Sequence, residues 1–293
     1  MSRLGRQAVT GAAALLVAAA VASLAACSQD QPASGKPTVV TSIYALQFAA
    51  DAVVRDAATV NNLAPAGVEP HDMELSVQQV TQLHDADLIV YVAGLAQAVD
   101  DSVRGAKGQK LEALTALGAD AIAGDPHFWL NPLLMAKVAD AVAEQMSSLD
   151  PSNKDSYSAN AAAFAERMTA LDRQWQTGTA TCDSRDFVSS HASFGYMAKR
   201  YNLTAHAVLG LNPDAEPTPA ALNAAIRIIR DKALTTVYTE ALESNRIAKT
   251  IAKDTGARVR VLDPMEGNTD KLGYVAIMKT NLNAFVAGNG CER

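Results

Sequence analysis

The chain has 293 residues, a length that suits one large domain or two of ordinary size. Hydrophobic residues make up 49% of it and charged residues 19%, so there is ample apolar material for a folded core. The formal net charge is −6 and there is no basic run, which argues against a nucleic-acid partner. Aromatic residues make up only 5%, which also argues against a base-stacking surface.

Residues 1–26 have the pattern of an export signal. A basic start (MSRLGR) precedes the apolar stretch AVTGAAALLVAAAVASLAA, and small residues lead up to Cys27. The sequence LAAC at Leu24–Cys27 resembles the box of bacterial lipoproteins, in which the cysteine receives a lipid and becomes the new N-terminus. An ordinary cleaved signal and an uncleaved anchor helix are the alternatives. We expect a lipid on Cys27 and a flexible tether over residues 27–37, because that segment is polar with Pro and Gly.

In the first half of the mature chain, short β-rich runs alternate with stretches in which apolar residues recur at helical spacing. We expect strands at residues 38–43, 59–64, 87–92 and near 109–114. We expect helices at residues 45–57, at 76–86 and near 96–104. Ser76 is suited to cap the second of these helices.

Two helical stretches, residues 132–150 and 151–177, fill the middle of the chain. Each begins at a proline, which the first turn of a helix tolerates. At about 1.5 Å per residue the second stretch is long enough to span a whole domain, so we expect a stiff connector. Beyond it, we expect strands at residues 185–190, 203–210, 234–239 and 257–262. Helices are expected at residues 193–201, 219–233 and 244–256, and over roughly 270–287.

Alternating strands and helices predict parallel sheets with right-handed crossovers. The fold class is therefore α/β, with two lobes of parallel sheet flanked by helices and joined by one long rigid helix. We expect the domains to be a signal peptide, a tether, an N-terminal lobe, a linking helix and a C-terminal lobe, at residues 1–26, 27–37, 38–150, 151–177 and 178–293.

Polar residues cluster where the predicted strands end. Open α/β sheets bind ligands beyond the carboxyl ends of their strands, and His71, His191, Glu240 and Asp263 each follow a strand in this way. His127 lies in the loop between the last strand of the first lobe and the helix that begins at Pro132. We therefore expect a cleft between the lobes to gather these side chains.

Three imidazoles and a carboxylate are a plausible tetrahedral set for Zn²⁺, whereas a manganese site is expected to have more oxygen ligands. The proline before His71 and before His127 restricts the local backbone, and Phe128 and Trp129 exclude water. A packed, hydrogen-bonded core histidine is the alternative for each of the three. His84 and His206 are interpreted as structural or exposed residues, because they fall within a helix and a strand.

Other acidic residues near the predicted site have open roles. Glu69 and Asp125 precede the two prolines and serve turn geometry as readily as chemistry. Glu240 is a candidate fourth ligand, a partner of a ligand, or a helix-capping acid.

Cys182 and Cys291 are the two cysteines beyond Cys27. An even pair in an exported protein favours a disulfide, with two unrelated thiols as the alternative. Neither has C-x-x-C spacing, so we do not interpret them as metal ligands.

At these residues the sequence resembles the zinc/manganese solute-binding lipoproteins of bacterial ABC transporters (cluster A-I, or family 9). PAGVEPHDMELS, DPHFWLNP, SSHASFGYMAKRY and VLDPM match the family's four ligand loops at His71, His127, His191 and Asp263. YTEALESNRIAKTIAKDTG matches the segment between the last two. The resemblance covers about Thr38 to Cys291.

The resemblance implies two α/β lobes, a rigid linking helix and a buried metal site between the lobes. Members with histidine at the third position resemble zinc-selective proteins, so His191 implies Zn²⁺, with Mn²⁺ as the alternative. Asp263 carries over as the carboxylate ligand. Glu240 carries over as an acid near the site, where Trp129 and Glu69 are further candidates.

The expected function is capture of Zn²⁺ outside the cytoplasmic membrane and delivery to an ABC permease, without catalysis. We expect a monomer, held by lipid to the outer face of that membrane. A secreted zinc hydrolase with Glu240 as base, and an adhesion or scaffold lipoprotein, are the rival hypotheses. A carboxylate in the fourth ligand position favours the carrier, and water there favours the hydrolase.

Overall fold

The computed structural model describes residues 35–242, 244–267 and 272–291 of the chain. The expected signal peptide, the lipid on Cys27 and most of the tether lie outside the described residues. By its contacts the chain divides into two units, Met1–Lys36 and Pro37–Arg293, and both lobes belong to the second unit. None of the helices in the described ranges combines the length and the hydropathy that a membrane span requires.

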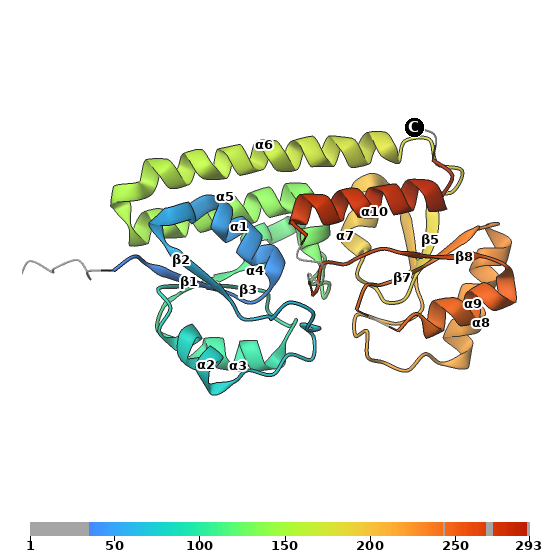
Figure 1. The fold of residues 1–293 in the computed structure, drawn as a ribbon, viewed down its shortest axis with the longest axis horizontal. Helices are drawn as coiled ribbons and strands as arrows, with labels where there is room; N and C mark the ends of the chain where they lie inside the picture. Colours follow the sequence, from blue (N-terminus) through green and yellow to red (C-terminus); the bar gives the residue numbers. More distant parts are fainter. Residues whose placement is uncertain (1–34, 243, 268–271, 292–293) are drawn as a thin grey trace, which may run out of the picture. The chain divides into compact units, whose positions relative to one another are not determined.

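The first lobe is built on a parallel four-stranded sheet in the order β2-β1-β3-β4. Strands β1, β2 and β3 are labelled in Figure 1. Its strands are β1 Thr38–Thr41, β2 Thr59–Asn62, β3 Leu88–Tyr91 and β4 Gln109–Glu112. Alternate residues of a strand point to opposite faces. Val39 and Val90 accordingly pack into one hydrophobic cluster, and Val40 and Ile89 into another.

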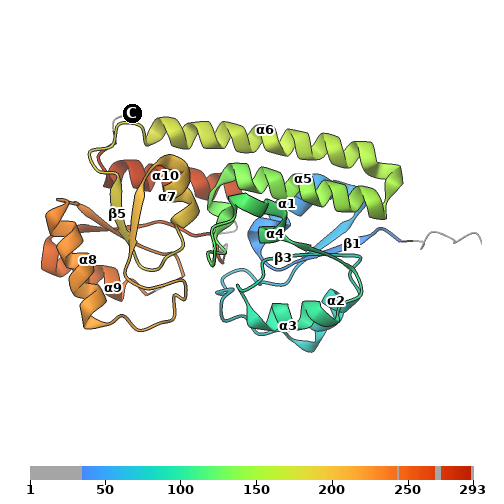
Figure 2. The ribbon, with the colours of Figure 1, turned by 180° about the vertical axis from the view of Figure 1, so that it is seen from behind.

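Helices cover both faces of this first sheet, as the resemblance and the alternating pattern predict. They are α1 Tyr44–Val54, α2 Val77–His84, α3 Gln97–Gly105, α4 Ala113–Leu117 and α5 Pro132–Leu149. Helices α1 and α5 lie on one face, and α2 and α3 on the other (Figure 2). The predicted cap is confirmed, because Ser76 and Gln79 form a reciprocal capping box at the start of α2.

Most strands are a few residues shorter than expected, and at one of them the reason is local. The strand predicted near 109–114 ends at Glu112, because a short helix that the sequence analysis missed begins at Ala113. The Glu112 carboxylate accepts hydrogen bonds from the backbone N–H groups of Leu114 and Thr115, which starts that helix.

The second lobe repeats the design with a parallel sheet in the order β6-β5-β7-β8. Its strands are β5 Asp186–Ser189, β6 Thr204–Ala207, β7 Thr236–Thr239 and β8 Arg258–Val261. Its helices are α7 Gly195–Tyr201, α8 Pro219–Asp231, α9 Arg246–Thr255 and α10 Tyr274–Gly288. Val188 and Val237 pack towards α8 and α9, whereas Phe187 and Tyr238 pack on Phe285 of α10.

The long helix α6, Lys154–Gly178, has 25 residues and passes along both lobes (Figures 1 and 2). It packs against α5 and α1 of the first lobe and against α10 of the second. Its Asp172 is 3% exposed and accepts two hydrogen bonds from Arg200 of α7, at 2.7 and 2.6 Å. A paired, charge-assisted contact of this kind fixes α7 on the long helix.

A disulfide joins Cys182 and Cys291, which resolves the sequence-based choice between a bond and two thiols. It ties the segment before β5 to the residues after α10 across a sequence separation of 109 residues. By the chain-entropy argument a loop of this length contributes about 4–5 kcal/mol to stability.

Candidate metal centre

Four loops, two from each lobe, bring the candidate ligands together. His71 lies between β2 and α2, and His127 precedes the 3-10 turn Phe128–Leu130 that leads into α5. His191 follows β5, and Glu266 follows β8. The two Pro-His sequences form turns, because Pro70 and Pro126 accept backbone hydrogen bonds from Met73 and Phe128.

The Nε2 atoms of the three histidines and Oε1 of Glu266 form one compact group. All four atoms lie within 4.8 Å of one another. Oε1 of Glu266 lies 3.5, 3.0 and 3.5 Å from Nε2 of His71, His127 and His191, respectively. Nε2 of His71 lies 3.3 Å from that of His127. The side chains of His127 and His191 are fully buried, whereas that of His71 is 10% exposed.

The carboxylate of this group differs from the one that the sequence analysis named. Among the described residues the grouped oxygen belongs to Glu266, three positions beyond Asp263. Asp263 Oδ1 instead accepts a hydrogen bond from the backbone N–H of Met265 at 2.7 Å. Its backbone N–H and C=O bond the side-chain amide of Asn281, at 2.8 and 2.6 Å.

Asp263 therefore holds the turn that delivers Glu266. Met265 within that turn has a positive φ of 63°, a conformation that is uncommon for a residue other than glycine. The sequence did contain a signal, since Glu266 lies in the loop after the last strand. The resemblance to the ligand motif VLDPM drew attention to the first acid of that loop.

Two of the clustered histidines pair their other ring nitrogen with a carboxylate. Nδ1 of His127 lies 2.8 Å from Oδ1 of Asp125, which also accepts the His127 backbone N–H at 2.9 Å. Nδ1 of His191 lies 2.5 Å from Oε2 of Glu240, whose Oε1 accepts the His191 backbone N–H at 3.1 Å. A proton held on Nδ1 leaves the Nε2 lone pair directed at the centre of the group.

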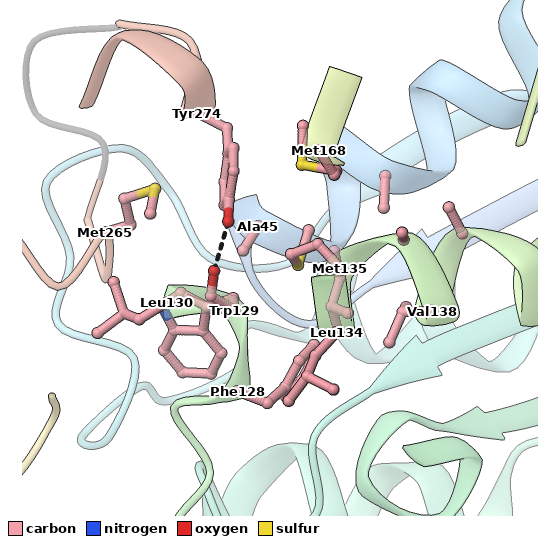
Figure 3. Close-up of a cluster of buried hydrophobic side chains, with 14 of the residues drawn as sticks. Ala45, Phe128, Trp129, Leu130, Leu134, Met135, Val138, Met168, Met265 and Tyr274 are labelled. Carbon is pink, nitrogen blue, oxygen red and sulfur yellow. Dashed lines mark hydrogen bonds between the residues drawn. The ribbon is translucent and has the colours of Figure 1, made fainter. Parts of the chain in front are cut away.

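Trp129 connects the site to both lobes. Its ring lies edge-on to His127, with ring centroids 5.3 Å apart, and its Nε1–H donates to the carbonyl of Pro264 at 2.7 Å. The hydroxyl of Tyr274 donates to the Trp129 carbonyl at 2.6 Å (Figure 3). Figure 3 shows Trp129 beside Phe128, Leu130 and Met265, in a buried apolar cluster.

Glu69 lies at the more open side of the centre. Its carboxylate accepts the backbone N–H of His71 at 3.2 Å. It also lines a cavity of about 280 Å³ together with Asp214 and Glu216 of the second lobe. Burial, and then the charge of Glu266, raise the pKa of Glu69 to about 8.

The electrostatics of the group suit a cation. Burial would raise the pKa of Glu266, but hydrogen bonds with His127, His191 and His71 hold it well below its ordinary value. Burial opposes a charge on His127, yet its hydrogen bonds to Asp125 and Glu266 raise its pKa. An ionised carboxylate thus sits among three imidazoles in a nearly water-free place.

The other two histidines lie elsewhere, as the sequence predicts. His84 ends α2, and His206 lies in β6. Nε2 of His206 bonds Oδ1 of Asp186 at 2.7 Å, in a pair that is partly exposed.

Comparison with known proteins identifies the family of the chain. Residues 39–288 match the family described as "Zinc-uptake complex component A periplasmic". The chain is 32% identical to the high-affinity zinc uptake system protein ZnuA of Bacillus subtilis (strain 168), over 94% of this chain and 95% of that protein. It is 31% identical to the zinc-binding lipoprotein AdcA of Streptococcus pneumoniae serotype 4, over 92% of this chain but 59% of that longer protein.

A solved structure agrees in fold. The Zn(II)-bound ZnuA-like domain of S. pneumoniae AdcA superimposes with a TM-score of 0.74 and 30% identity, and the match covers 87% of this chain and 99% of that domain. With a family match over nearly the whole described chain, the protein belongs to the zinc-uptake component A family of solute-binding proteins.

Proposed function

We propose that this protein captures Zn²⁺ outside the cytoplasm and passes it to an ABC permease, without catalysing a reaction. The observation that carries the proposal is the convergence of three imidazole nitrogens and one carboxylate oxygen within 4.8 Å. In this proposal His71, His127, His191 and Glu266 bind the metal. Glu266 takes the role that the resemblance implied for Asp263.

The spacing of the donor atoms supports zinc. Four ligands at about 2.0–2.1 Å from a tetrahedral Zn²⁺ lie about 3.3–3.4 Å apart. Of the six separations among these donor atoms, the one from His71 Nε2 to His127 Nε2 and the three from Glu266 Oε1 to the histidine Nε2 atoms run from 3.0 to 3.5 Å. Three nitrogens and one oxygen also suit Zn²⁺ better than Mn²⁺, which prefers more oxygen ligands.

The carboxylates behind the rings support high affinity. Asp125 and Glu240 fix the orientation and the protonated nitrogen of His127 and His191, so little order has to be imposed when the metal binds. We assign Glu240 this positioning role rather than that of a ligand. Trp129 supports the site through its hydrogen bond to the Pro264 carbonyl. Glu69 supports it by accepting the backbone N–H of His71.

The fourth donor favours a carrier over the rival hydrolase. A catalytic zinc keeps one position for water, whereas four protein ligands close the coordination shell. Glu240, the candidate base of the hydrolase hypothesis, is engaged with His191 by both of its oxygens.

The sequence and the relatives support the proposed location and partner. The lipobox at Leu24–Cys27 supports a lipid anchor on the outer face of the cytoplasmic membrane, and one relative is named a lipoprotein. Membership of an uptake family supports an ABC permease as the receiver of the metal. A monomer suffices, because one chain supplies all four donors.

Metal analysis and calorimetric titration of the purified protein test this proposal. We expect one Zn²⁺ per chain, displacement of Mn²⁺ by Zn²⁺ in competition, and a large loss of affinity in His71→Ala and Glu266→Ala. Wild-type affinity in both variants would overturn the four-ligand assignment. If Asp263→Asn loses affinity as strongly as Glu266→Ala, Asp263 itself contacts the metal.

A further inference from the structure

Helix α7 of the second lobe contacts the loop that carries His127 of the first lobe. The helix begins at Gly195 and packs on the 3-10 turn Phe128–Leu130. Its second residue, Tyr196, accepts the backbone N–H of Ile122 at 2.7 Å and donates its hydroxyl to the backbone carbonyl of Asp125 at 3.1 Å. One buried phenol thus bridges both ends of the segment Ile122–Asp125.

The start of α7 also leaves space for the side chain of Asp125. A Cβ atom placed on Gly195 would lie 2.5 Å from Oδ2 of Asp125, far closer than such atoms approach in proteins. The φ of Gly195 is not in the left-handed region, so its backbone conformation accepts other residues. The requirement for glycine is therefore one of space beside the Asp125 carboxylate.

The Asp125 carboxylate lies between Gly195 and His127. Oδ1 accepts the backbone N–H of His127 and meets Nδ1 of its ring, while Oδ2 faces Gly195. A displacement of this carboxylate by α7 would rotate or release the His127 ring. The C-terminal end of α7 cannot easily move to relieve such a clash, because Arg200 is bonded to the buried Asp172 of α6.

We propose that Gly195 and Tyr196 are positioning residues for His127, so that the second lobe orients a metal ligand of the first lobe. Gly195 leaves space for the Asp125 carboxylate, and the hydroxyl of Tyr196 fixes the position of the Asp125 backbone through its hydrogen bond to the carbonyl. The inference rests on the proposed zinc-binding function. It adds that the ligand set is assembled by docking of the lobes through α7, and not by each lobe alone.

Gly195→Ala is the first test. Alanine favours a helix more than glycine does, so α7 itself gains from the change. We expect Zn²⁺ affinity to fall about 10-fold to 100-fold, the range for residues that support a ligand. The matched control is Gly210→Ala, since Gly210 is an exposed glycine of the same lobe with nothing within 4 Å of the added Cβ. It should bind Zn²⁺ as the wild type does.

A double-mutant cycle separates positioning from general damage. Asp125→Ala removes the atom that the new methyl group meets, so Gly195→Ala should cost little further affinity in that background. An equal loss from Gly195→Ala in both backgrounds would overturn the inference. The visible spectrum of bound Co²⁺, which reports ligand geometry, should change in Gly195→Ala and stay unchanged in Gly210→Ala.

Tyr196→Phe gives a test that does not depend on a steric clash. Loss of one neutral hydrogen-bonding hydroxyl should weaken Zn²⁺ binding about five-fold. Tyr238→Phe is the matched control, because its buried hydroxyl bonds Asn289 at 2.7 Å within the second lobe. If the wild type binds no Zn²⁺, the proposed function fails. If it binds and both α7 variants keep its affinity, only the positioning role fails.

Discussion

His127, His191 and His206 each pair a ring nitrogen with a carboxylate oxygen, but the pairs lie in different regions of the molecule. Those of His127 with Asp125 and His191 with Glu240 have fully buried rings between the lobes. That of His206 with Asp186 lies on the edge of the second sheet, with the two side chains 26% and 19% exposed. The same chemical pair thus occurs in the candidate metal centre and on a surface.

Two differences separate these regions. The buried pairs use Nδ1 and leave Nε2 directed at the group of candidate ligands, whereas His206 uses Nε2 to bond its carboxylate. The buried pairs also lie in loops at the centre, while His206 lies within a strand. A histidine–carboxylate pair is therefore a support for a metal ligand only where the second nitrogen meets other donors.

The largest expected effect comes from removing a ring. His191→Ala should lose more than 100-fold in Zn²⁺ affinity, exceeding the roughly 10–100-fold cost of losing a supporting residue. His206→Ala should titrate as the wild type in the calorimeter. Equal affinities for the two variants would erase the distinction between the buried and the surface pair.

The carboxylates give the next effect in size. Asp125→Asn and Glu240→Gln keep the shape but remove the charge that holds the proton on Nδ1, so each should weaken Zn²⁺ binding about 10–100-fold. Asp186→Asn makes the same change in the surface pair and should have no effect on binding. A fluorescent zinc-chelator competition measures all three. Wild-type Zn²⁺ affinity in Glu240→Gln would mean that His191 needs no charged partner to orient its ring.

A neutral contact should matter less than the charged pairs. Trp129→Phe removes the hydrogen bond to the Pro264 carbonyl near Glu266, and a net loss of about 1 kcal/mol predicts roughly five-fold weaker Zn²⁺ binding. Trp175→Phe is the control, because Trp175 is equally buried and its Nε1 has no hydrogen-bond partner in the described part of the chain. If both variants lose affinity alike, the effect comes from ring volume and not from the bond.

Much of the fold follows from local signals in the sequence. The eight strands predicted at short β-rich runs are all present, and Ser76, Pro132 and Thr218 start helices for the capping reasons that apply to isolated helices. These signals lie within a few residues of the element that they define. The missed helix at Ala113 is only five residues long, too short for apolar periodicity to reveal it.

The site could be predicted only in part, because its remaining details depend on contacts between distant segments. The ends of predicted strands point to His71 and His191, since parallel strands end at one edge of a sheet. His127 is a candidate from its place in the loop before the helix at Pro132. The choice between Asp263 and Glu266 depends on the turn held by Asn281, 18 residues away. The proposed role of Asp125 depends on the space that Gly195 leaves beside its carboxylate, which local sequence patterns do not indicate.

The surface pair has its own, smallest effect, on stability at low pH. The hydrogen bond from His206, opposed by some burial and helped by Lys232, lowers the pKa of Asp186 below its ordinary value of 3.8. A carboxyl with a depressed pKa in the fold stabilises the native state above its unfolded pKa, and this contribution disappears as pH falls through the folded value. Exposed pairs contribute about 0.2–1 kcal/mol.

Urea unfolding at pH 5.5 should therefore show Asp186→Asn less stable than wild type by that amount. The gap should close as the pH is lowered below 3.8, with Zn²⁺ binding at neutral pH unaffected. A gap that persists at the lowest pH would mean that the Asp186 side chain stabilises the sheet by contacts other than its charge.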